Sequence, residues 1–165
     1  MAAKELTMQP FIYLQTQKWN PISMAIRFAT RSDWSHAGFV CGNRFFSAQG
    51  DGVRWRDCDP HAKLLFLTAP KIEEAFNWAT TQLGKPYDFT ALFGLALDRN
   101  WREDDSWFCS ELVAAAFEAV GAPLFNLSTP VYRITPRDIL LSPYVQVVTP
   151  VAYEMSHEER MSRST

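Results

Sequence analysis

Apolar residues along the chain follow two kinds of repeat, which predict strands in some places and helices in others. Short apolar or alternating runs predict six strands, at residues 11–14, 37–41, 44–49, 53–56, 64–67 and 145–148. Apolar residues at helical spacing predict four helices, at residues 21–29, 70–83, 88–97 and 107–120. Because helices alternate with hairpins, we expect an α+β fold.

Turn and cap residues mark where these elements begin and end. Gly42-Asn43 predicts a two-residue hairpin turn, which would pair residue 41 with residue 44. Pro70 is placed to open one helix, and Gly84 to close it. Ser106 is the expected N-cap of the helix over 107–120.

Length and charge narrow the class of protein. We expect a single domain over residues 1–155, followed by a polar, frayed tail over 156–165. The net charge of −2 argues against a nucleic-acid partner. A local group of arginines is interpreted as a solvated face, with a carboxylate or phosphate site as the alternative: Arg27, Arg31, Arg44, Arg54 and Arg56.

The cysteines and the N-terminus bear on location and cofactors. Three cysteines are too few for a disulfide framework. The first residues lack the apolar core of a signal peptide, and no apolar run is long enough to span a membrane. We therefore expect no signal peptide and cytoplasmic synthesis, with release or delivery to a cell wall by another route. We expect no cofactor. A zinc site of His36, Cys41, Cys58 and His61 would lack any paired ligand spacing.

Cys109 and His36 are the candidate reactive residues. Cys109 falls in the predicted first turn of a helix, where N–H groups and the helix dipole lower a thiol pKa. His36 begins an apolar strand flanked by small residues. Taken alone, each residue is more typical of a packed core position, but together they are the minimum set for a thiolate nucleophile and its base.

A third residue is expected to orient the imidazole. Counting back from the predicted turn places Gln49 directly opposite His36, with Ser47 as the diagonal neighbour on the same face. Either side chain can accept a hydrogen bond from the ring. Asp51 and Asp57 are further candidates, although both are typical of turn or exposed positions.

Four segments resemble motifs of one family, the NlpC-like papain-fold cysteine amidases. They are SHAGFV at 35–40 (family SHVGI), GKPYD at 84–88 (G-x-x-Y-D), FCSELV at 108–113 (D-C-S-G-L-V) and TPRDIL at 135–140 (P-G-D-L). The histidine precedes the cysteine here. That order is typical of the circularly permuted branch, which includes YiiX/YaeF-like amidases and, more distantly, lecithin retinol acyltransferase-like proteins.

The resemblance implies a permuted papain-like fold, in which a helix carrying Cys109 packs on an antiparallel sheet carrying His36. It implies that Cys109 is the nucleophile, His36 the general base, Ser47 the third residue and Tyr87 a substrate-site residue. Phe108 departs from the family pattern, because it stands where an aspartate is common.

The expected activity is hydrolysis of a peptide or peptidoglycan amide through a thioester. The alternatives are hydrolysis or transfer of a lipid acyl group, and a catalytically inactive binding or structural protein such as a virion component. Whether the polar loop at 98–105 acts as a lid stays open.

Overall fold

The structure is a computed structural model, which describes residues 9–16, 23–24, 27–28, 31–57, 59, 62–88, 106–126 and 134–149. In these residues six strands form one antiparallel sheet, in the order β4-β3-β2-β1-β5-β6. The strands are β1 (Pro10–Thr16), β2 (His36–Cys41), β3 (Arg44–Gln49), β4 (Gly52–Arg56), β5 (Lys63–Thr68) and β6 (Gln146–Val148). The helices are α2 (Ile72–Thr80), α4 (Cys109–Ala119) and α5 (Pro136–Leu141).

The hairpin between β2 and β3 has the predicted register. Cys41 pairs with Arg44, and Phe39 pairs with Phe46. Gly42 has a φ of 61°, a left-handed conformation that favours glycine at this turn position. The prediction of a two-residue turn is therefore confirmed.

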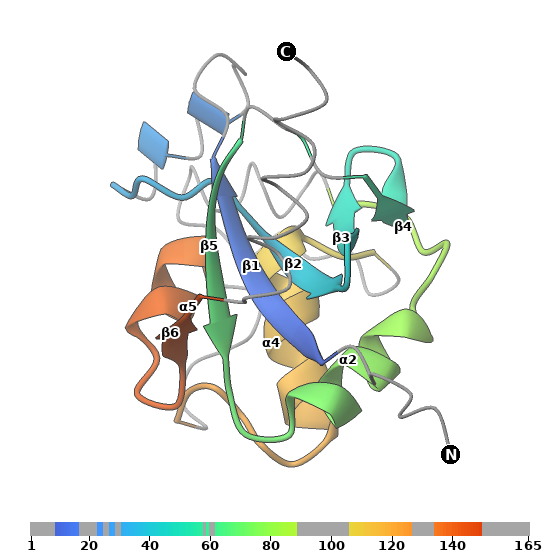
Figure 1. Cartoon of the computed structure of the whole chain (residues 1–165). Coiled ribbons are helices and arrows are strands. Elements are labelled where there is room, and N and C mark those ends of the chain that lie inside the picture. The colour runs from blue at the N-terminus through green and yellow to red at the C-terminus, as the bar shows by residue number, and fades with distance from the viewer. Residues whose placement is uncertain are drawn as a thin grey trace, which may run out of the picture.

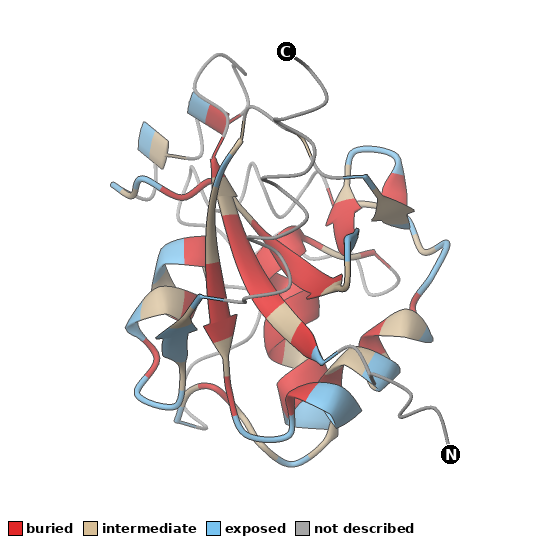
Figure 2. Ribbon diagram, in the orientation of Figure 1, coloured by how far each residue is buried: buried red, intermediate tan, exposed pale blue. Residues whose placement is uncertain are grey.

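One face of the sheet carries the main core. Residues that alternate along the strands, such as Ile12 and Leu14 of β1, pack with apolar residues of α2 and α4. Figure 1 shows α4 lying behind β1 and β2. Figure 2 shows that the buried residues are concentrated in the central strands and in α4, whereas α5 and β6 expose much of their surface.

The other face of the sheet carries a second apolar cluster. Tyr13, Val40, Phe45 and Phe66 form its buried part. His36 alternates with Gly38 and Val40 along β2, so its position belongs to this second face.

The prediction of an α+β fold with an antiparallel sheet packed against the helix of Cys109 is confirmed.

Two helix starts were predicted too early. Helix α4 begins at Cys109, not at residue 107, and its N-cap is Phe108 rather than Ser106. The reason is that Trp107 is held in an extended bridge to Tyr87, so the chain cannot turn into a helix before residue 108. Helix α2 begins at Ile72, after Lys71 in a left-handed conformation with φ 59°.

Other predicted segments are described in part. Ser23, Met24, Arg27 and Phe28 are helical, and the rest of the predicted helix over 21–29 lies outside the described residues. Apart from Asp88, the predicted helix over 88–97 lies outside them as well, as do the loop over 98–105 and the tail over 156–165. In the described part of the chain, no helix is long and apolar enough to cross a membrane.

Helix α5 was not among the predicted helices. It is opened by Thr135, whose Oγ1 accepts a hydrogen bond from the N–H of Asp138 at 3.3 Å. The Asp138 carboxylate in turn accepts the Thr135 N–H at 2.8 Å. This reciprocal pair, with a proline at the first helical position, is a recognisable start signal in the sequence.

Candidate active site

Cys109 is the first residue of α4, and its thiol lies against β2. The backbone N–H of Ala37 donates a hydrogen bond to its Sγ atom, and the N–H groups of Ser110 and of Cys109 itself are also directed at the sulfur. The residue is 1% exposed. The contact places the thiol beside the residue that follows His36.

A chain of backbone contacts leads from the sheet to the start of α4. Val53 of β4 donates its N–H to the Lys85 carbonyl at 2.9 Å and accepts the Gly84 N–H at 2.9 Å. Gly52 has a φ of 98°, and a Cβ atom there would lie 2.7 Å from the Lys85 oxygen, so only glycine fits this approach. The segment that starts with Gly84 is thereby fixed along β4.

The same segment brings Tyr87 to the thiol. Trp107 donates its N–H to the carbonyl of Pro86 at 3.0 Å, and Asp88 donates its N–H to the carbonyl of Trp107 at 3.1 Å. The Tyr87 ring lies 5.9 Å from the Phe108 ring and packs on the pair formed by Phe108 and Cys109. Burial, followed by the nearby Cys109 and Asp88, raises the pKa of Tyr87, so its hydroxyl keeps its proton.

His36 has both predicted third residues against one ring nitrogen. Its Nε2 atom lies 3.0 Å from Oγ of Ser47 and 3.3 Å from Nε2 of Gln49. The hairpin register and the family motif had favoured different residues, and the structure brings both to the imidazole. Ser47 is fully buried, whereas Gln49 reaches the surface pocket described below.

Tyr13 and Gly38 shape the other side of His36. The Tyr13 ring lies 5.9 Å from the imidazole and 4.7 Å from the Phe45 ring. A Cβ atom on Gly38 would lie 2.6–2.7 Å from the Phe46 carbonyl oxygen, Ser47 Cβ and Tyr13 Cε1. The missing side chain at residue 38 therefore lets the Tyr13 ring pack beside His36.

The charge states of the pair differ from the sequence prediction of a lowered thiol pKa. Burial raises the pKa of Cys109 to about 11, and the surrounding N–H groups offset this only in part. Burial, followed by the charge of Arg56, lowers the pKa of His36 to about 3. In this conformation the pair is a neutral thiol and a neutral imidazole.

The remaining acidic candidates belong to the β3–β4 turn and the segment after β4. Asp51 is exposed and paired with Arg56, and this pairing lowers its pKa. Asp57 is exposed and lines the pocket. Neither carboxylate is a hydrogen-bond partner of His36.

Three members of the predicted arginine group have different surroundings. Arg54 is 61% exposed and lies near Asp51, as a solvated residue would. Arg44 lies over the Trp55 ring, 5.1 Å from its centre. Arg56 is 18% exposed and lines the pocket with Gln49.

The described residues include no group of three or more potential metal ligands. Cys41 and Cys109 are free cysteines. Cys58 and His61 of the alternative zinc set lie outside the described residues.

The sequence analysis missed two contributors to the site. The Ala37 N–H involves no side chain, so residue type carries no sign of it. Tyr13 lies in a strand whose sequence is typical of a buried core strand. The sequence feature that could have indicated its role is Gly38, because a glycine in a strand often marks the close approach of another group. No family model matches this chain, and no curated protein is similar to it in sequence.

Proposed function

We propose that this protein is a cysteine hydrolase of permuted papain-like fold, which cleaves an amide bond of the peptide or peptidoglycan type. The observation that carries the proposal is the hydrogen bond from the Ala37 N–H to Sγ of Cys109. It joins a cysteine at a helix start to the strand residue next to His36. The imidazole itself is held on its Nε2 side by Ser47 and Gln49.

The proposed reaction begins with proton transfer from the Cys109 thiol to His36 as the sulfur attacks the carbonyl carbon. The resulting tetrahedral oxyanion accepts hydrogen bonds from N–H groups at the start of α4, and the imidazolium returns its proton to the leaving amine. Water, activated by the neutral imidazole, then hydrolyses the thioester. The product acid leaves and the free thiol is restored.

This role requires one tautomer of His36. The ring must carry its resting proton on Nε2, so that Nδ1 is the base. Ser47 Oγ then accepts the Nε2–H, at the observed 3.0 Å. Gln49 accepts through its carbonyl oxygen after a half-turn of its amide, because its NH₂ group would otherwise face another donor.

Burial links access to reactivity. A thiol that is 1% exposed cannot meet a substrate carbonyl until neighbouring groups move. Burial is also the largest cause of the raised thiol pKa and of the lowered imidazole pKa. Opening the site to a substrate therefore moves both pKa values towards their ordinary range and favours proton transfer.

The test is trapping of the acyl-enzyme. Wild-type protein is incubated with activated peptide amides, peptidoglycan fragments and lipid esters, and the intact mass is followed. An acyl adduct on Cys109 with turnover is expected, and both are lost in Cys109→Ala and His36→Ala. Cys41→Ala is the matched control and keeps full activity. Turnover that survives in folded Cys109→Ala contradicts the mechanism.

A second candidate is a binding protein that keeps this fold without turnover. The observation that favours it is the buried, protonated thiol of the resting site. Under this alternative, no substrate class gives an adduct, and Cys109→Ala has the same ligand-binding properties as the wild type.

A further inference from the structure

A surface pocket of about 340 Å³ opens beside the candidate active site, on the face of the sheet that carries His36. Tyr13 and Gln49 line it, and both also contact the imidazole. Its volume falls at the lower end of the range of roughly 300–1,000 Å³ that is typical of small-molecule sites. A ligand here would lie one side chain away from His36.

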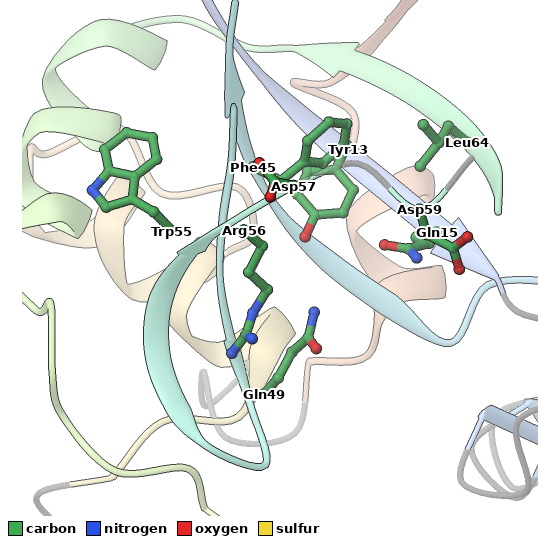
Figure 3. Close-up of a pocket in the computed structure, with 9 residues that line it drawn as sticks. All are labelled: Tyr13, Gln15, Phe45, Gln49, Trp55, Arg56, Asp57, Asp59 and Leu64. Carbon is green, nitrogen blue, oxygen red and sulfur yellow. The ribbon is translucent and has the colours of Figure 1, made fainter. Parts of the chain in front are cut away.

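One end of the pocket is rich in hydrogen-bond donors. Figure 3 shows the Arg56 guanidinium and the Gln49 amide facing the same space, with the Tyr13 hydroxyl turned towards it. Arg56 donates through its terminal nitrogens to Asp51 and to the Gly52 carbonyl. Its Nε atom is buried and has no hydrogen-bond partner among the described residues. This end suits a carboxylate.

The opposite end is rich in acceptors. Figure 3 shows Asp59 and Gln15 together beside Leu64, with Asp57 nearer to the aromatic rings. The Asp57 carboxylate near the Tyr13 and Phe45 rings and the Asp59 carboxylate beside Gln15 favour an ammonium group, since aromatic faces also attract cations. A purely anionic ligand would be repelled at this end, and a purely cationic ligand would leave the donors of the Arg56 end without an acceptor.

We propose that this pocket is a subsite for a zwitterionic peptide end, a small peptide unit with a free ammonium and a free carboxylate. The carboxylate binds Arg56 and Gln49, and the ammonium binds the carboxylates of Asp57 and Asp59. The Tyr13 and Phe45 rings contact the apolar part between them. As a statement about substrate it rests on the proposed hydrolase function, and it specifies short, unblocked peptides as the substrate class.

Binding to the Cys109→Ala variant tests the proposal without turnover. The probes are L-alanyl-L-alanine, its N-acetyl form, its C-terminal amide and the doubly blocked form, each titrated by calorimetry. We expect the free dipeptide to bind best and each single block to weaken binding about tenfold or more, as loss of a charge-assisted hydrogen bond does.

Second-site variants assign each charge to one end of the pocket. In Arg56→Gln, the dipeptide and its amide should bind equally. In the double variant Asp57→Asn with Asp59→Asn, the dipeptide and its N-acetyl form should bind equally. The matched controls are Arg54→Gln and Asp33→Asn, which change exposed charges outside the pocket and should leave all four affinities unchanged.

Equal binding of all four probes, or no binding up to on the order of 10 mM, would overturn the subsite. The two proposals fail separately. Amide hydrolysis that needs Cys109 and His36, without discrimination among the probes, removes the subsite and keeps the hydrolase. Charge-selective binding without any acyl adduct keeps the subsite and removes the hydrolase.

Discussion

The N–H of Ala37 donates to Sγ of Cys109, which ties the second residue of β2 to the first residue of α4. The backbone N–H of a buried strand residue thus binds the thiol, and the side chain of the preceding residue, His36, is the candidate base. Because Ala37 is fully buried, this arrangement is fixed by the sheet rather than by a surface loop.

The reactivity of the resting thiol follows from its burial. With its pKa raised to about 11, Cys109 should be alkylated by iodoacetamide more slowly than Cys41, which is half-buried. Its rate should rise about tenfold per pH unit above neutrality, as the thiolate fraction does. Peptide-resolved mass spectrometry measures both cysteines in one sample. Faster labelling of Cys109 than Cys41 at about pH 6 would show a preformed thiolate instead.

Removing either partner of His36 should lower kcat/KM on an amide substrate. Ser47→Ala, which deletes the closer and fully buried partner, should cost about tenfold or more, and Gln49→Ala less. The double variant should lose less than the product of the two losses, because both residues act on one nitrogen. Gln146→Ala, at an exposed position, is the control. Independent, multiplicative losses would contradict shared orientation of the ring.

Gly38→Ala tests the close approach of Tyr13. The new methyl group would meet three neighbours at 2.6–2.7 Å, two of them on β3. Such overpacking should lower the free energy of unfolding by about 1–3 kcal/mol. Thermal or urea unfolding measures the loss. Gly84→Ala is the control, because its new methyl group lies in open space at a φ of 87°. Its free energy of unfolding should fall through backbone strain alone. A Gly38→Ala variant as stable as wild type would refute the packing described here.

Gly52→Ala should disturb the site from a distance. The substitution combines a φ of 98° with a 2.7 Å approach to the Lys85 oxygen, so the segment leading to Tyr87 must shift. We expect lower kcat/KM at a temperature where the variant is still folded. Gly121→Ala, with a φ of 67° and no neighbour within 4 Å, is the matched control. Unchanged kinetics in folded Gly52→Ala would show that the Gly84–Tyr87 segment does not support the site.

His36 should make stability depend on pH in one direction. Its folded pKa is lowered to about 3, below the ordinary value of 6.5, so the unfolded chain binds the extra proton between these values. The free energy of unfolding should therefore fall as the pH drops through this window. His36→Gln removes the contribution, and its stability should change less between about pH 7 and pH 4. Identical slopes for the two proteins would mean that the folded imidazole titrates normally.

Local parts of the fold and site could be predicted from sequence. The Gly42-Asn43 turn sets the β2–β3 register, and counting from it brings Gln49 and Ser47 to His36, because hairpin geometry depends on nearby residues. The start of α4 could not be predicted locally. Ser106 resembles an N-cap, but Trp107 bonds to the Pro86–Asp88 segment and stays extended.

The charge of the thiol also lay beyond sequence reasoning. The position of Cys109 at a helix start predicts a lowered pKa, and the N–H groups there do act in that direction. Their effect is outweighed by burial, which depends on how β2, α4 and the Tyr87 segment pack together. Nothing in residues 106–113 alone indicates the extent of that burial.

The two outward hydrogen bonds of Val53 also affect how the protein behaves among copies of itself. β4 is an edge strand of the sheet. The outward N–H and carbonyl groups of an edge strand can pair with a strand of another molecule. Here the N–H and carbonyl of Val53 are already bonded to Lys85 and Gly84. The segment that supports Tyr87 therefore also shields this edge against intermolecular strand pairing and aggregation.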